Sequence, residues 1–398
     1  MFVSLHYRPF RYLWTGTLLW AISRWMETIV IGWLVLDMTG SPFMVGVVTA
    51  ARGFPFLFFG ALGGVVADRV PSRPQLLVAA QLAASMLTLL LAFLTITGMI
   101  QVWHLIIITF LVGTAMAFDQ PTRQTLVYDL VGDNLVNALA LNSSAFNLAR
   151  ILGPAAGGLL LGWVGPAGCF IFMAICSFVG MGSILLMGDT PRVRSAQVGS
   201  VWQNLKDGLG YVLSNPVTRT LLLLEAITDF AALPYIFVLM PVFARDVLAV
   251  GATGLGLMTA SVGVGALSGA LWLALMGNRL PKGPTLIASA LFYGLFLLLF
   301  SLSPWYPLSL VLLALTGAAT SIQVTLEATL LQVMVAEEMR GRVMGAYVLT
   351  WGFMPIGNLQ AGAVATLAGA PFAAAAGGLV LAVFAVGMAW TARSLRRA

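Results

Sequence analysis

Apolar runs long enough to cross a lipid bilayer follow one another along almost the whole chain, and this feature limits the possible folds most. A helix that crosses the hydrocarbon needs about 20 apolar residues, and such runs recur with short connectors through all 398 residues. Hydrophobic residues make up 60% of the chain and charged residues 9%, whereas a soluble domain carries about 25% charge. We therefore expect lipid to be the solvent of this protein.

The runs predict an all-α membrane protein with twelve transmembrane helices. We expect an N-terminal six-helix bundle over 1–187, a linker over 188–216 and a C-terminal six-helix bundle over 217–398. Within the linker, Val201, Leu205, Leu209 and Val212 recur at helical spacing, which predicts a short amphipathic helix on the membrane surface. The predicted spans are 13–36, 42–67, 75–97, 102–127, 138–163, 166–187, 219–244, 252–277, 284–302, 306–334, 342–367 and 371–392.

The distribution of Lys and Arg predicts the orientation. If the N-terminus is inside, the inner loops and tails hold fifteen of these residues, and the outer side holds Arg245 alone. Such a bias marks the cytoplasmic side. We expect a multi-pass protein of the bacterial inner membrane with both termini in the cytoplasm. The net charge of +6 comes from basic residues that are spread over separate loops and tails. Because they form no single basic patch, we predict no nucleic-acid partner.

An internal repeat relates the two halves. A shift of 210 residues places Asp68–Pro74 over Asn278–Pro284, with Arg and both prolines matched. Both segments follow the second span of their half. We infer two six-helix pseudo-repeats related by an axis along the membrane normal.

Several function classes are excluded by what the sequence lacks. It has no Gly-x-x-x-x-Gly-Lys nucleotide loop, and its two histidines, His6 and His104, fall at predicted membrane edges. Cys169 and Cys176 lie within an apolar run, where packing is their simplest role. We predict no enzyme, no metal and no cofactor, and we expect a functional monomer surrounded by membrane lipids.

Motifs along the chain resemble those of the major facilitator superfamily. The loop Gly64–Arg73 is similar to the family's G-x-x-x-D-R-x-G-R-[RK] signature, although Pro71 and Ser72 depart from it. Gly153-Pro154-Ala-Ala-Gly157-Gly158 is similar to the end of the family's antiporter signature, whose earlier glycine is Ala149 here. The segments GWLVLDMTGSP, FDQPTRQTLV and NALALNSSAFNLARILGPAAGGLL resemble the bacterial branch of siderophore exporters and macrolide efflux proteins.

This resemblance implies a multidrug-type antiporter. A proton-coupled exporter would move amphipathic small molecules, such as drugs or siderophore-like metabolites, by alternating access. Two alternatives on the same fold remain open. One is a lysolipid or lipid transporter, and the other is a cation-coupled importer. A scaffold without transport is disfavoured because carboxylates within spans are costly.

The loop signature predicts a gate latch. Asp68 is expected to engage the start of the eleventh span, beside the helix dipole, and Arg73 is expected to pair with Asp129. Arg69 belongs to the same signature. The alternative is a loop that only anchors the chain by its positive charge. In the fifth span, Gly153, Pro154, Gly157 and Gly158 predict a close and bendable helix contact.

Ionisable residues inside spans are functional candidates by default. Arg24 and Glu27 lie three apart on one face of the first span, either as a structural pair or with Glu27 exchanging a proton. Glu225 and Asp229 lie four apart in the seventh span, where mutual repulsion favours a bound proton or a bound cation. These three carboxylates are the proton-coupling candidates.

The remaining charges within spans leave alternative roles open. Asp119 and Arg123 have pairing geometry on the fourth span. Glu327 lies at the matching depth of the tenth span, so a gate pair with Arg123 is one hypothesis. Arg52 and Arg150 either attract an anionic cargo or neutralise carboxylates. Among the many aromatic residues, Trp25 and Trp351 are the preferred cavity candidates because they neighbour polar positions.

Overall fold

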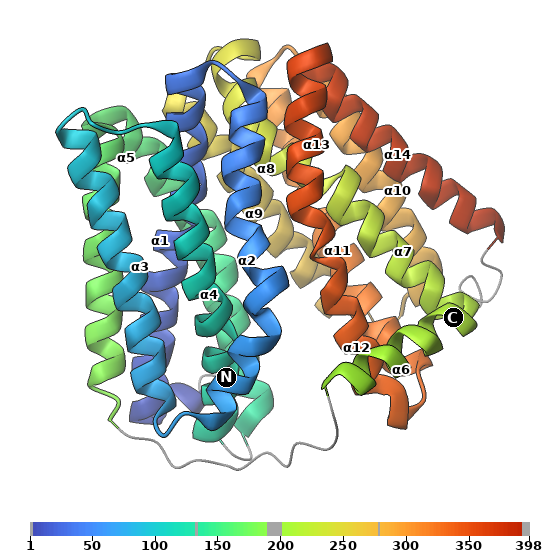
Figure 1. Cartoon of the computed structure of the whole chain (residues 1–398). Coiled ribbons are helices and arrows are strands. Elements are labelled where there is room, and N and C mark those ends of the chain that lie inside the picture. Colours follow the sequence, from blue (N-terminus) through green and yellow to red (C-terminus); the bar gives the residue numbers. More distant parts are fainter. Residues whose placement is uncertain (1–2, 132–133, 189–200, 278, 392–398) are drawn as a thin grey trace. The chain divides into compact units, whose positions relative to one another are not determined.

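The computed structural model describes residues 3–131, 134–188, 201–277 and 279–391, and nearly all of them lie in helices (Figure 1). No strand occurs among these residues. The elements are η1 (Val3–His6), α1 (Arg8–Thr39), α2 (Pro42–Arg69), α3 (Arg73–Ile96), α4 (Val102–Val131), α5 (Leu135–Leu185), α6 (Val201–Ser214), α7 (Pro216–Ala231), α8 (Leu233–Val242), η3 (Phe243–Val247), α9 (Gly251–Met276), α10 (Lys282–Ser301), α11 (Tyr306–Met334), α12 (Glu337–Thr350), α13 (Phe353–Ala368) and α14 (Ala370–Thr391).

Twelve membrane crossings follow from these helices. Ten described segments are long and apolar enough to cross a membrane. One of them, Asn137–Leu185, has 49 residues and would be about 74 Å long as a straight helix, more than twice the hydrocarbon thickness of about 30 Å. It bends at Gly165, whose φ of 70° and ψ of −178° suit glycine, and therefore holds two spans. The short helices α12 and α13 together supply the twelfth, which confirms the predicted fold class.

Local sequence signals explain where several helices begin. Ser41 accepts a hydrogen bond from the Met44 amide at the start of α2, and Ser72 accepts one from the Gln75 amide at the start of α3. Asn215 caps α7 in the same way. In all three helices a proline occupies one of the first two positions, where its missing N–H costs no hydrogen bond. The N-cap side chain and the proline together determine where each of these helices begins.

Two predicted spans are interrupted. The seventh span divides into α7 and α8 at Ala232, which has φ −126° and ψ −54°. The eleventh span divides into α12 and α13 at Trp351 and Gly352. Neither interruption was expected from the apolar pattern, because hydropathy does not depend on local backbone geometry. Both interruptions bear on the candidate site below.

The chain forms two compact units. Unit 1 contains Met1–Ala196 and Val250–Ala260, and unit 2 contains Gln197–Ala249 and Ser261–Ala398. In unit 1, α1 packs against α5 and α2 against α4, while in unit 2, α10 packs against α11 and α14. The first turns of α9 belong to unit 1 because Gly256 packs directly on Gly158, where an added methyl group would lie 2.7 Å from the Gly158 Cα.

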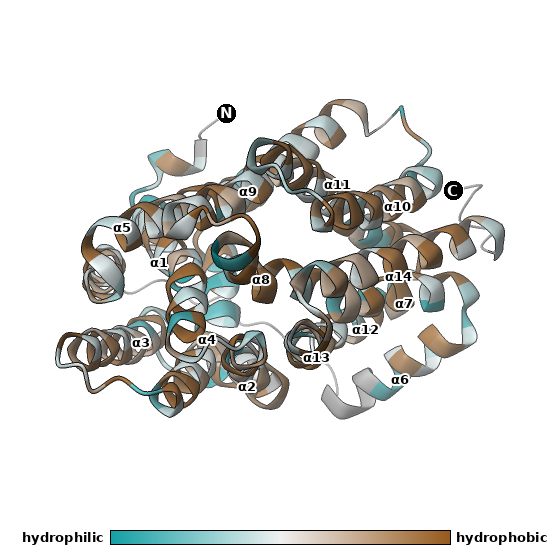
Figure 2. Cartoon of the chain, turned by 90° about the horizontal axis from the view of Figure 1, so that it is seen from above, coloured by the Kyte–Doolittle hydropathy of each residue, from teal (hydrophilic) through white to brown (hydrophobic). Residues whose placement is uncertain are grey.

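Large apolar side chains are exposed over the helices. Leu275, Leu367 and Trp390 each expose more than three quarters of their area. Apolar residues predominate along α3 and α14 (Figure 2). In water such surfaces would drive association, whereas in a bilayer they face lipid. The described helices therefore belong to a multi-pass membrane protein.

Candidate functional site

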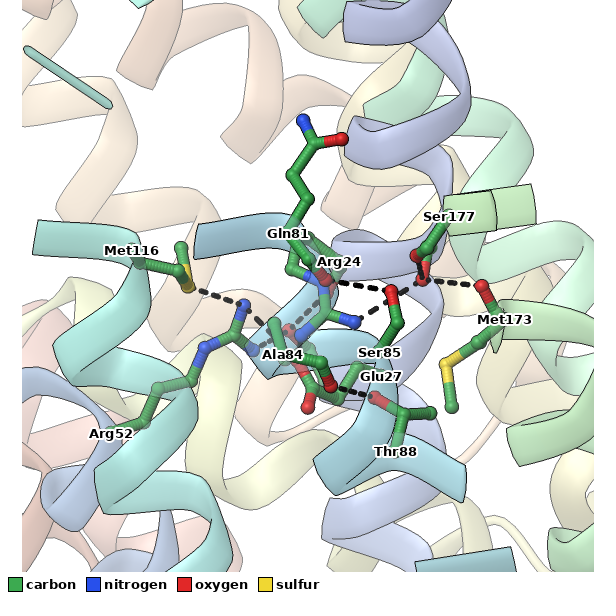
Figure 3. Close-up of polar contacts among 12 residues, drawn as sticks. Arg24, Glu27, Arg52, Gln81, Ala84, Ser85, Thr88, Met116, Met173 and Ser177 are labelled. Carbon is green, nitrogen blue, oxygen red and sulfur yellow. Dashed lines mark hydrogen bonds and ion pairs between the residues drawn. The ribbon is translucent and has the colours of Figure 1, made fainter. Parts of the chain in front are cut away.

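A buried charge network lies in the middle of unit 1 (Figure 3). On α1, Arg24 donates a 2.8 Å hydrogen bond from Nη1 to Oε2 of Glu27, as their spacing of three residues allows. Arg52 from α2 approaches the same Oε2 at 3.5 Å. The side chains of Arg24 and Glu27 are 5% and 1% exposed. Two guanidinium groups therefore share one carboxylate, which leaves one positive charge in excess.

Neutral groups hold the two arginines in place. Arg24 donates to Ser23 Oγ at 3.3 Å, and the Ser23 hydroxyl donates to the Met173 carbonyl on α5 at 3.2 Å. Arg52 donates to Thr28 Oγ1 at 3.0 Å and to the Met116 sulfur at 3.6 Å. Sequence reasoning did not identify Thr28 or Met116, although Thr28 lies one residue after Glu27.

Asp119 and Arg123 form a second buried pair in unit 1. Arg123 Nη2 donates to Asp119 Oδ1 at 3.0 Å, and its Nη1 donates to Thr17 on α1 at 2.8 Å. The guanidinium lies 4.8 Å from the ring centroid of Trp20, within the range of a cation–π contact. These partners all belong to unit 1. The predicted gate pair of Arg123 with Glu327 would join the two units and stays a prediction.

The loop signature brings three helix ends of unit 1 together. Arg73, at the start of α3, forms an ion pair with Asp129 near the end of α4, and its Nε donates to the Ala67 carbonyl of α2 at 3.1 Å. Arg69 is exposed. The side chain of Asp68 lies outside the described residues. The latch role of this loop therefore stays a prediction.

The glycines of α5 lie at close helix contacts. A methyl group at Gly153 would lie 2.7 Å from Trp25 Cβ, and one at Gly157 would lie 3.1 Å from Met26 Cγ. Gly158 lies equally close to Gly256 of α9, and Pro154 contributes its carbonyl to that contact. The side chains of α1 and the first turns of α9 thus leave no room for anything larger at these positions.

Arg150 of α5 lies over Trp25 of α1, with its guanidinium carbon 5.5 Å from the ring centroid. Both side chains are half-buried. Trp25 precedes Thr28 by three residues, so both lie on one face of α1. Trp25, which contacts Arg150, and Thr28, which accepts a hydrogen bond from Arg52, therefore lie one helical turn apart on α1.

Unit 2 contains three buried carboxyl groups. Glu225 and Asp229 come from α7 and are 3% and 5% exposed, and Glu327 from α11 is fully buried. Glu225 lies against Glu327, Tyr347 and Trp351. We call Glu225, Asp229 and Glu327 the carboxyl cluster. The predicted pair thus gains Glu327 as a third member.

The carboxyl cluster has few compensating groups. Among the described residues, none of its members forms an ion pair, and Glu225 Oε2, Asp229 Oδ2 and both oxygens of Glu327 lack a donor in hydrogen-bond geometry. Two amide oxygens of unit 2, Gln323 Oε1 and Asn358 Oδ1, are also buried without a donor. The amide of Gln323 is oriented by its 2.8 Å hydrogen bond to Thr228. Buried acceptors without donors are costly, so the described residues leave the negative charge of this region uncompensated.

Both interrupted helices border the carboxyl cluster. Asp229 lies in the last turn of α7, and Trp351 ends α12. Gly357 of α13 fits against the carbonyls of Asp229 and Phe230, where an added methyl group would lie 2.9 and 2.6 Å from their oxygens. The Tyr235 hydroxyl on α8 donates a hydrogen bond of 2.9 Å to Gln360 Oε1 on α13. The carboxyl groups therefore lie where the helices of unit 2 are interrupted.

Sequence reasoning missed Gln323, Tyr347 and Asn358. Gln323 precedes Glu327 by four residues and shares its helix face, which is a usable signal. Tyr347 and Asn358 flank an interruption that the sequence did not indicate. None of the groups of His, Cys, Asp and Glu among the described residues has the arrangement needed to hold a metal ion.

Comparisons with known proteins agree with this architecture. Residues 1–397 match the family model described as transmembrane secretion effector. Multidrug efflux pump Tap of Mycolicibacterium fortuitum is 27% identical over 351 residues, which cover 85% of this chain and 84% of that protein. Enterobactin exporter EntS of Escherichia coli O1:K1 / APEC is 27% identical over 315 residues, with 78% and 74% covered.

Solved transporter structures share the fold. The nucleoside transporter NupG has a TM-score of 0.74 at 15% identity, with 98% of this chain and 99% of that chain covered. A D-xylose–proton symporter has a TM-score of 0.77 at 15% identity, with 98% of both chains covered. The chain belongs to the transmembrane secretion effector family, in the drug- and siderophore-exporter branch of the major facilitator superfamily.

Proposed function

We propose that this transporter is a proton-coupled exporter, an antiporter that moves amphipathic small molecules out of the cell by alternating access. It would lie in the bacterial inner membrane with both termini in the cytoplasm, as the bias of Lys and Arg across its loops favours. The relatives named as efflux pumps support export over the importer and lipid-transporter alternatives.

The carboxyl cluster is the observation that carries the proposal. Three anions buried together in a membrane protein repel one another and lose their hydration. A bound proton converts an acceptor into a donor and removes one charge. Since Glu225 and Glu327 touch, a proton held between them satisfies two oxygens at once. We therefore assign proton coupling to Glu225, Asp229 and Glu327.

Glu27 is less suited to this role. Two arginines already pair with its carboxylate in unit 1, whereas the carboxyl cluster has no such cation among the described residues. We expect Glu27 to offset part of the charge of Arg24 and Arg52. It remains a second candidate for proton exchange because its Oε1 is buried without a donor among the described residues.

Proton exchange and cargo export are coupled if a bound proton and a bound cargo exclude each other. Loss of the proton leaves the cluster with unbalanced negative charge, which favours the conformation that admits water to it. Protonation of the cluster favours the conformation in which water does not reach it. The proton gradient would then supply the energy, in line with the absence of a nucleotide-binding loop from the sequence.

Dye uptake into inverted membrane vesicles tests this proposal. We expect ethidium, rhodamine 123 or sulforhodamine B to accumulate when respiration acidifies the lumen, and nigericin to abolish that uptake. The Glu225→Gln/Asp229→Asn variant should lose at least 90% of the gradient-driven rate, roughly the effect of removing a required acid–base group. The exposed Glu338→Gln change is the matched control. Full uptake by the double variant, or uptake that only a sodium gradient drives, would remove the proton from the mechanism.

A further inference from the structure

Arg52 is an incompletely satisfied cation at mid-depth of unit 1. It is the eleventh residue of α2, about 15 Å from the start of that helix. Its guanidinium has five N–H donors, and its contacts are Thr28 Oγ1 at 3.0 Å, the Met116 sulfur at 3.6 Å and Glu27 at 3.5 Å. Only the first is a full-strength hydrogen bond. Arg52 therefore has capacity for a further acceptor.

The backbone of Arg52 is fixed in position. Gly113 of α4 packs on it, and a methyl group there would lie 3.1 Å from the Arg52 carbonyl carbon. The only carboxylate that Arg52 contacts among the described residues, Glu27, is held more closely by Arg24 at 2.8 Å. The Arg52 guanidinium therefore shares its counter-ion with a second arginine.

The Arg52 side chain is 21% exposed. A charged group at the middle of a span does not face hydrocarbon, because it would lose its hydration without replacement. Its exposed part must then meet water or a polar cargo. On the adjoining face of α1, Thr28 and Trp25 are half-buried, and Arg150 lies over the Trp25 ring. Arg150 thus adjoins the indole of Trp25, and Arg52 binds Thr28 three residues further along the same helix.

We propose that Arg52, Thr28 and Trp25, with Arg150 beside them, bind the acidic group and the aromatic ring of a flat anionic cargo. A carboxylate, sulfonate or ionised phenol would accept hydrogen bonds from the planar fork of Arg52. The indole of Trp25 would pack against the cargo ring, and the excess positive charge of the Arg24–Glu27–Arg52 network would balance the cargo charge. This inference rests on the proposed transport of small molecules but not on proton coupling.

Equilibrium binding to the purified full-length protein, without any gradient, tests the site. The probes are 2-naphthalenesulfonate, neutral 2-naphthylmethanol and (2-naphthylmethyl)trimethylammonium, which share a ring system and do not titrate near neutral pH. We expect calorimetry to show the tightest binding for the sulfonate. The Arg52→Gln variant should weaken sulfonate binding about tenfold, because a hydrogen bond to a charged group is lost, and leave the neutral probe within about twofold. Arg245→Gln, in the exposed pair with Asp246, is the control.

Two further variants keep the test decisive if Arg52→Gln does not fold. Arg52→Lys retains the charge and should keep the preference for the sulfonate. Glu27→Gln removes the internal counter-charge and should strengthen sulfonate binding severalfold. Equal loss of all three probes in Arg52→Lys, or weaker sulfonate binding in Glu27→Gln, would make these residues structural and overturn the site. If the uptake experiments disprove proton coupling, the binding results expected here stay the same.

Discussion

At the scale of residues, the two units balance their buried charges differently. Unit 1 pairs its carboxylates, Glu27 and Asp119, with neighbouring arginines. Unit 2 leaves Glu225, Asp229 and Glu327 without a cation among the described residues. A buried pair is costly to break, whereas an unpaired buried anion is costly to keep. Substitutions in the two units should therefore have opposite effects on stability.

The Glu327→Gln variant should be more stable than the wild type at alkaline pH. A carboxyl group that keeps its proton in the folded protein and loses it on unfolding makes the folded state bind more protons, so stability falls as pH rises. Removing Glu327 should reduce this fall and stabilise the protein by about 1–3 kcal/mol at pH 8.5. Thermal unfolding of the variant and the wild type at pH 6 and pH 8.5 measures this difference in stability. An identical pH dependence in variant and wild type would show that Glu327 binds no proton.

The Asp119→Asn variant should be strongly destabilised. It leaves the Arg123 guanidinium buried beside Thr17 without its counter-ion, a loss of about 3–5 kcal/mol. The double variant Asp119→Asn/Arg123→Gln should recover much of that loss. Fluorescence-detected size exclusion of each variant gives the folded fraction. If the double variant were no more stable than Asp119→Asn alone, the broken ion pair would not be the source of the destabilisation.

At the scale of elements, the amphipathic helix α6 packs on α12 within unit 2. Gly208 contacts the Arg342 carbonyl, and Asp207 accepts a 3.0 Å hydrogen bond from Arg342. The same helix α12 carries Tyr347, which lies against Glu225. A helix outside the twelve spans thus supports the element that borders the carboxyl cluster.

The Gly208→Val variant should loosen α12, because the added side chain has no room against the Arg342 carbonyl. Hydrogen exchange in residues 337–350 should accelerate at least severalfold. Asp207→Asn should change it little, since a half-exposed ion pair contributes only about 0–1 kcal/mol. If Gly208→Val left exchange in α12 unchanged, the close contact would not be needed to hold the helix.

Sequence patterns predicted the elements better than their interruptions. The division of α5 fell at Gly165–Pro166, where backbone-permissive and backbone-restricting residues adjoin. The break between α7 and α8 at Ala232 lies two residues before Pro234, whose ring disfavours a continuous helix, and Gly357 packs against the last turn of α7. Glu225 and Asp229 were identifiable because charges within spans are rare. Tyr347 was not, because only the folded unit brings it close to Glu225.

At the scale of the whole molecule, a twelve-span secondary transporter needs side chains that bind and release the ion whose gradient drives transport. The long apolar helices, the family match and the transporter folds define the carrier. In the proposed mechanism the carboxyl cluster of unit 2 binds the proton, and the arginines of unit 1 bind an acidic cargo. The proposed export by proton exchange uses both sets of residues.

Purified protein in liposomes with an imposed pH gradient measures this central claim most directly. The dye that inverted vesicles accumulate fastest would be added outside liposomes whose lumen is set either one pH unit below or one pH unit above the medium. Proton exchange predicts dye accumulation only with the acid lumen, and its loss on addition of nigericin. Accumulation with the alkaline lumen, or equal rates in both directions, would contradict antiport with protons.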